Sequence, residues 1–96
     1  MVVASAIDEL RCFFERNGYV RRQLAHRLEA DGPSKYKKGD EVRLVANTRA
    51  ELKKIRRLLV VAGFEPARPF AKGNQHRQPI YGRETVEKFL ALIGAR

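Results

Sequence analysis

The chain has few of the residues on which disulfide, metal or membrane chemistry depends: one cysteine, two histidines and no tryptophan among 96 residues. A single cysteine, Cys12, cannot form an internal disulfide, which fits a reducing compartment such as the cytoplasm. The acidic residues lack the spacing of a metal site, and there is no glycine-rich phosphate loop, so we expect no metal and no cofactor. No apolar run approaches the roughly 18 residues that span a bilayer, so we expect no membrane partner.

Acidic side chains are also scarce relative to basic ones. Twenty Lys and Arg stand against eleven Asp and Glu, which leaves a net charge of +9. The excess is concentrated in residues 31–63, which hold nine basic and four acidic residues. A folded surface this basic repels itself, and a polyanion relieves the repulsion while releasing condensed counterions. Nucleic acid, RNA or DNA, is therefore the expected partner, and we predict a non-enzymatic binding or accessory protein.

What the chain does contain is enough apolar sequence for one folded domain. With 44% apolar residues in 96, we expect a single compact α+β domain over residues 1–96. The expected order is α-α-β-α-β-β-α: an N-terminal helical pair, then a small sheet of about three strands covered by two helices. The expected helices are 5–16, 20–30, 49–62 and 84–93, and the expected strands are 41–46, 64–71 and 77–82.

Local signals differ in strength along this order. Thr48 and Glu51 match a capping box, and Gly63 supplies a helix stop, so 49–62 is the clearest helix. Residues 41–46 are mostly apolar between turn formers, which is typical of a central strand. The segments 64–71 and 77–82 contain prolines, which predicts short, edge or bulged strands. For 20–30 the apolar spacing favours a helix, although residues 19–22 could also be extended.

Basic and amide side chains form three groups that we expect to contact nucleic acid. The first is the solvent face of helix 49–62, the second a basic connector around Tyr36, and the third a polar hairpin over residues 72–78. Phosphate contacts would come mainly from the first two, and the hairpin would add limited base readout. The candidate binding residues are Lys35, Lys37, Lys38, Arg49, Lys53, Lys54, Arg56, Arg57, Lys72, Asn74, Gln75 and Arg77.

Other interpretations of the same sequence stay open. Two short helices joined at Asn17-Gly18 invite comparison with a helix-turn-helix, whose second helix reads the major groove. The uncompensated charge would also suit an adaptor or inhibitor that binds an acidic surface of a nucleic-acid-processing enzyme. Neither Cys12 nor His26 has a companion that indicates nucleophilic catalysis.

Two segments resemble parts of known families. The run Leu59-Val60-Val61-Ala62-Gly63-Phe64, followed by Lys72-Gly73-Asn74-Gln75-His76, a strand and a helix, resembles the core of HicA-type ribonuclease toxins. That resemblance implies RNA cleavage with His76 as the catalytic residue. The tail from Pro79 to Leu90 is similar to the closing strand and helix of LAGLIDADG homing endonucleases. It implies nucleic acid as the ligand, although the motif helix with its acidic metal ligand is missing.

Overall fold

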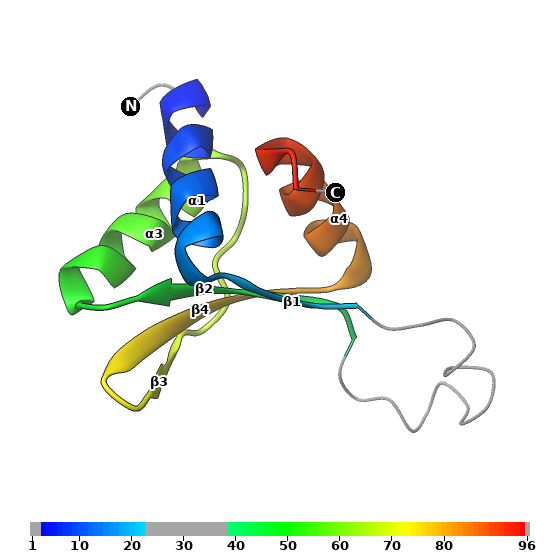
Figure 1. Ribbon diagram of the computed structural model, residues 1–96. Coiled ribbons are helices and arrows are strands. Elements are labelled where there is room, and N and C mark those ends of the chain that lie inside the picture. Colours follow the sequence, from blue (N-terminus) through cyan, green and yellow to red (C-terminus); the bar gives the residue numbers. More distant parts are fainter. Residues whose placement is uncertain (1–2, 23–38, 96) are drawn as a thin grey trace, which may run out of the picture.

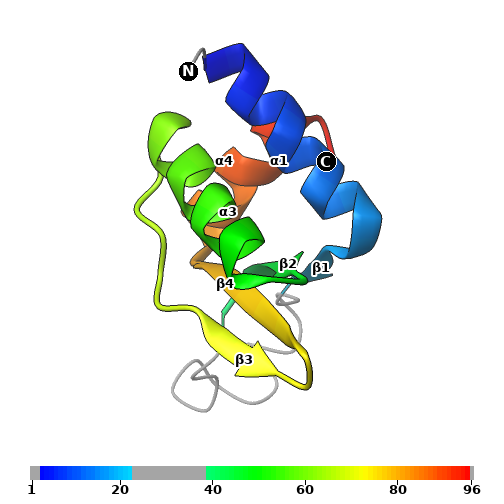
Figure 2. The same ribbon diagram turned by 90° about the vertical axis from the view of Figure 1, so that its left-hand side faces the viewer.

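The computed structural model describes residues 3–22 and 39–95 (Figure 1). Three helices lie together on one face of a four-stranded antiparallel sheet of order β1-β2-β4-β3 (Figures 1 and 2). This arrangement confirms the predicted α+β class. The elements are α1 (Val3–Asn17), β1 (Tyr19–Arg21), β2 (Glu41–Ala46), α3 (Arg49–Val61), β3 (Phe70–Lys72), β4 (Gln75–Tyr81) and α4 (Arg83–Ile93).

The hydrophobic core lies between the sheet and the three helices. Alternate residues of β2 point to opposite faces, and Val42, Leu44 and Ala46 on the helix side are 0% exposed. Phe89 of α4 is also fully buried and meets Phe14 and Phe64 edge to face, with ring centres 6.2 and 5.8 Å away. Strand β2 pairs with both β1 and β4, so the expectation that 41–46 is a central strand is confirmed.

Helix α3 begins and ends as its sequence predicts. The Thr48 side chain accepts a hydrogen bond of 3.1 Å from the Glu51 backbone N–H, which caps the first turn. At the other end, Gly63 has φ of 94°, a conformation that glycine adopts without a side-chain clash. The Phe64 N–H then donates to the Leu59 carbonyl at 2.9 Å, which turns Phe64 back into the core.

The second predicted helix, 20–30, is wrong where the structure describes it. Tyr19–Arg21 is a strand that pairs with Arg43, Val42 and Glu41 of β2, so the sheet has four strands rather than about three. Three residues carry too little periodicity to separate a helix from an extended segment, and pairing with β2 decides between them. Residues 23–30 lie outside the described residues. The described residues therefore contain no N-terminal helical pair. The start of the second helix that a helix-turn-helix would need is a strand instead.

The predicted strands 64–71 and 77–82 are displaced in the structure. Residues 64–69 make no strand, because Pro66 and Pro69 cannot donate to a ladder, and β3 begins only at Phe70. Strand β4 begins earlier than predicted, at Gln75, after a turn in which Gly73 has φ of 61°. Pro79 lies beyond the end of β3, so it has a sheet neighbour on the β2 side alone.

Candidate functional site

The face of the sheet opposite the helices carries most of the polar and aromatic side chains of the strands. Residues paired directly across an antiparallel sheet share a face, so the register places Tyr19, Arg43 and Pro79 together there. Among the described residues no helix lies on this side (Figures 1 and 2). We call it the open sheet face. It consists of Tyr19, Arg21, Glu41, Arg43, Val45, Phe70, Lys72, Gln75, Arg77, Pro79 and Tyr81.

Arg43 lies at the centre of this face between two aromatic rings. Its guanidinium carbon is 5.5 Å from the centre of the Tyr19 ring and 5.2 Å from that of Phe70, both within cation–π range. Its Nε donates a hydrogen bond of 2.6 Å to Glu41. This hydrogen bond raises the pKa of Arg43 above its ordinary value, although burial opposes the shift. Arg43 therefore connects the outer strands to the middle of the sheet.

Glu41 is a buried carboxylate on the same face, only 1% exposed. It accepts hydrogen bonds of 2.6 Å from both Arg21 and Arg43, because β1 and β2 place the two arginines beside it. A buried carboxylate needs such partners, since an unpaired buried charge is costly. The three groups together carry one net positive charge, so this half of the face is only weakly cationic.

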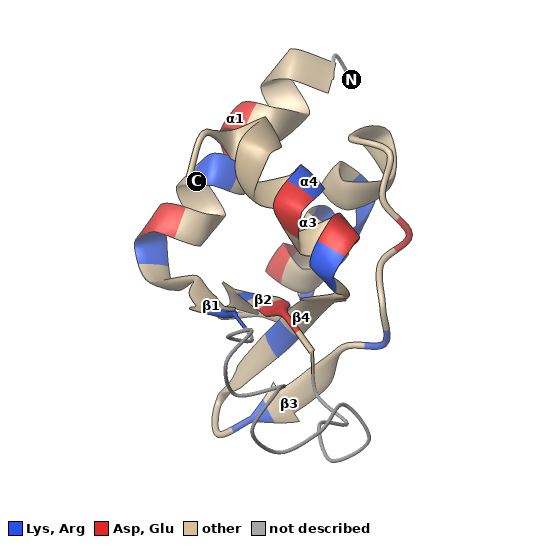
Figure 3. Cartoon of the chain, turned by 90° about the vertical axis from the view of Figure 1, so that its right-hand side faces the viewer, with Lys and Arg blue, Asp and Glu red and all other residues tan. Residues whose placement is uncertain are grey.

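The other half of the open sheet face keeps its positive charge. Within the described ranges, neither Lys72 nor Arg77 forms an ion pair with a carboxylate. Arg77 donates instead to the Gln75 side-chain oxygen at 3.0 Å, and Gln75 donates to Asn47 at 3.0 Å. Basic positions on β3 and β4 are visible in Figure 3, whereas the helices carry both acidic and basic positions. Lys72 and Arg77 are therefore available to an anion.

A shallow hollow of about 380 Å³ opens on this cationic half. Tyr19 stands at its wall with 47% of its surface exposed, and Tyr81 on the same face is 52% exposed. The combination offers cations for phosphate, amides for polar base edges, and an aromatic ring for stacking. The residues that line the hollow are Asn17, Tyr19, Arg43, Val45, Lys72, Gln75 and Arg77.

The structure divides the predicted basic face of helix α3. Lys54 pairs with Glu9 of α1 at 2.6 Å. Arg56 turns toward the sheet, where it donates to the Gln78 side chain and to the Ala67 carbonyl. In the part of the chain that the structure describes, Arg49, Lys53 and Arg57 have no hydrogen-bonded or charged partner, and all three are exposed.

Several other predicted residues do not join the open sheet face. Lys35, Lys37 and Lys38 lie outside the described residues. Asn74 is exposed at the hairpin tip. His76 is half-buried on the helix side of the sheet, opposite Ala46 and Ala71, and so faces away from Arg77. Across residues 3–22 and 39–95 there is no cluster of His, Cys, Asp and Glu that could hold a metal ion.

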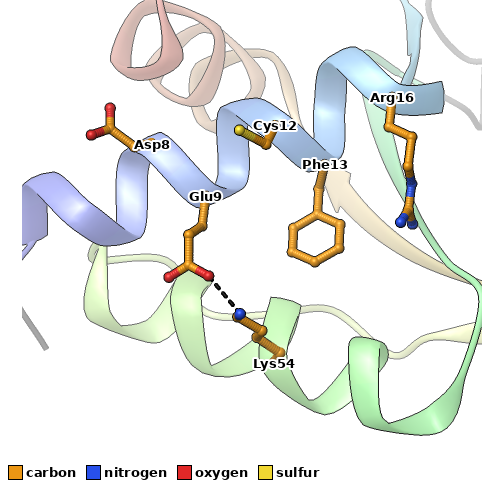
Figure 4. Close-up of a pocket in the computed structure, with 6 residues that line it drawn as sticks. All are labelled: Asp8, Glu9, Cys12, Phe13, Arg16 and Lys54. Carbon is orange, nitrogen blue, oxygen red and sulfur yellow. Dashed lines mark ion pairs between the residues drawn. The ribbon is translucent and has the colours of Figure 1, made fainter.

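A second cavity, of about 390 Å³, lies between α1 and α3 (Figure 4). It is lined by Phe13 and Cys12, with charged side chains around its edge. These charges already have partners: Lys54 pairs with Glu9, and Arg16 forms hydrogen bonds of 3.0 and 3.1 Å with Glu51. Cys12 is a free, exposed thiol at this cavity, but no histidine or second cysteine is among the lining residues, so the cavity offers no nucleophile with a base beside it.

Tyr19 and Arg43 are not among the site residues that the sequence predicts. The signal was present in 41–46, where Glu41 and Arg43 alternate with apolar residues and so point away from the core. For Tyr19 no local signal was available, because its place on this face comes from pairing with Arg43.

Comparison with family models, curated proteins and solved structures finds no match. No helix in the described ranges combines the length and the apolar character that crossing a membrane requires.

Proposed function

We propose that the protein binds nucleic acid on the open sheet face, with Lys72 and Arg77 contacting phosphates. The observation that carries the proposal is the pair of unneutralised cations beside the exposed ring of Tyr19, around a single hollow. A face built only for solubility has no need of an exposed tyrosine, and a protein interface favours an apolar centre with few charges. Nucleic acid has a partner for each kind of group: its phosphates for the cations and its bases for the tyrosine ring.

The energetics of such a site follow from its charges. Each cation that neutralises a phosphate releases condensed counterions, so binding weakens as salt rises. Stacking of a base on an aromatic ring contributes about 1–3 kcal/mol and tolerates any base. Gln75 is held by Asn47 and Arg77, so its amide is oriented before a ligand arrives. The site therefore suits binding with modest sequence preference.

The test is fluorescence anisotropy with short labelled RNA, single-stranded DNA and duplex DNA over a range of salt concentrations. We expect binding whose logarithm falls linearly with the logarithm of salt concentration. The double variant Lys72→Gln/Arg77→Gln should reduce the salt slope by about 2, one for each phosphate that the protein no longer neutralises. The Tyr19→Ala variant should weaken binding to single strands more than binding to duplex.

A matched control removes the same charge from the opposite layer of the molecule. Arg83→Gln/Lys88→Gln, on helix α4, lowers the net charge equally but leaves the open sheet face intact. If both double variants weaken binding of the labelled RNA or DNA equally, the positive charge acts without a defined site and the proposal is wrong. The RNA is also analysed on a denaturing gel after incubation. Cleavage that disappears in His76→Ala would favour the ribonuclease interpretation instead.

A further inference from the structure

Helix α3 carries a row of three cations along its solvent side. Arg49, Lys53 and Arg57 follow one another at four-residue spacing, so their Cα atoms are separated by about 6 Å along the helix axis. They lie opposite the buried side of the helix, which is made by Ile55, Leu58 and Leu59. We call these three residues the α3 row.

The α3 row stays unneutralised because the neighbouring carboxylates are engaged elsewhere. Glu51, the acidic residue of α3, is held by Arg16 of α1, and Glu9 is held by Lys54. Like charges at four-residue spacing destabilise a helix by about 0.2–0.5 kcal/mol for each pair. The row therefore weakens the isolated fold slightly, and an anion bound along it would remove that repulsion.

The α3 row and the open sheet face belong to different layers. The sheet lies between its open face and the helices, and the row points away from the core on the far side of α3 (Figures 1 and 2). One straight segment of nucleic acid cannot touch both surfaces. Two separate cationic surfaces on one small protein can hold two separate segments.

The composition of the row favours phosphates over an acidic protein. Val60 is the one large apolar side chain of α3 that is strongly exposed, at 60%, among the described residues. A protein interface of normal size needs an apolar centre that this helix lacks. A phosphate backbone needs only cations at a regular spacing, which the row supplies.

We propose that the α3 row is a second phosphate-binding surface, so that one protein molecule joins two segments of nucleic acid. The inference rests on the proposed function for the first segment and adds a second contact to it. Three phosphate contacts give a salt slope of about −2.7 on duplex DNA, compared with about −1.8 for the two contacts of the open sheet face, so binding of the second segment falls faster as salt rises.

The experiment mixes two duplexes of the same sequence, one carrying a donor dye and the other an acceptor. Energy transfer between them reports that they are joined, while anisotropy reports binding of a single duplex. For the wild type we expect both signals at low salt, with energy transfer disappearing first as salt rises. The triple variant Arg49→Gln/Lys53→Gln/Arg57→Gln should abolish energy transfer while single-duplex affinity stays within about threefold. A matched triple variant, Arg68→Gln/Arg83→Gln/Lys88→Gln, should retain energy transfer.

The outcomes separate the two proposals. Single-duplex binding without energy transfer overturns the second surface and leaves the open sheet face standing. Energy transfer that persists in the α3 triple variant also overturns the second surface, because another contact must join the duplexes. No binding in either assay overturns the proposed function. Labelled poly-glutamate is added as a further probe: if its binding requires the α3 row and no duplexes are joined, the row serves an acidic protein.

Discussion

The guanidinium of Arg56 donates a hydrogen bond of 2.7 Å to the side-chain oxygen of Gln78, a residue that is 0% exposed. The same Arg56 nitrogen donates to the Ala67 carbonyl at 2.8 Å. One side chain thus connects helix α3, strand β4 and the segment that leads into β3. Arg56 and Arg57 are neighbours in a basic run, yet Arg56 is held inside the fold while Arg57 faces solvent.

Replacing Arg56 should cost stability, whereas replacing Arg57 should not. In Arg56→Met the buried Gln78 oxygen is left without its donor, and an unsatisfied buried polar group costs about 1–3 kcal/mol. In Arg57→Met only an exposed side chain without a partner is removed, so we expect a change within about 0.5 kcal/mol. Urea denaturation of both variants measures the difference. Equal midpoints would mean that the Arg56 contacts do not hold in solution.

Gly18 occupies the tight connection between α1 and β1. A Cβ added there would lie 2.6 Å from the carbonyl oxygen of Phe14 and 2.9 Å from its Cα, both parts of the backbone. We expect Gly18→Ala to destabilise the protein by about 1–3 kcal/mol, because that backbone must shift. Gly39 is the matched control, since a Cβ added there meets nothing within 4 Å. Gly39→Ala should be neutral or slightly stabilising in the same thermal melts, and a loss as large as that of Gly18→Ala would refute this account.

Glu51 should make stability depend on pH in the acid range. Hydrogen bonds from Arg16 and from the Asn47 backbone lower the pKa of Glu51 below its ordinary value. A lowered pKa means that the folded state prefers the ionised form, so the stabilisation is present above about pH 4.3 and is lost as pH falls further. Glu51→Gln should reduce the free energy of unfolding by about 1 kcal/mol at neutral pH.

The difference between wild type and Glu51→Gln should shrink toward zero as the pH falls through the folded-state pKa, as measured by urea denaturation at a series of pH values. Glu65→Gln is the control, because Glu65 is exposed in the segment after α3 and has no ion pair among the described residues. A constant difference between wild type and Glu51→Gln at all pH values would show that the carboxylate charge contributes nothing.

Glu41 should stabilise the fold and weaken nucleic-acid binding. Glu41→Gln removes the charge that holds Arg21 and Arg43, so we expect a loss of about 1–3 kcal/mol in folding. The two arginines then become available to phosphates, and each new contact should steepen the salt slope by about 1. Anisotropy well below the unfolding midpoint measures this. Glu51→Gln changes the net charge equally on the helix side, and an equal gain in its binding would contradict a role for the open sheet face.

The elements that the sequence predicts well are those specified by neighbouring residues. The Thr48 cap, the apolar positions of α3 and the Gly63 stop lie within one segment, and their physics acts over a few residues. Likewise, the mostly apolar residues of 41–46 predict a buried central strand directly. In both cases the burial seen in the structure follows the pattern in the chain.

What the sequence alone determined is a basic α+β domain with one central strand, one strongly capped helix and a surplus of cations. The tertiary structure decided which cations remain free, because ion pairs such as Lys54 with Glu9 join residues 45 positions apart in the sequence. It also decided that Tyr19 belongs to a strand and shares a face with Arg43 and Arg77. These relationships depend on strand register and helix packing, which are set by contacts between distant segments, and no local pattern encodes them.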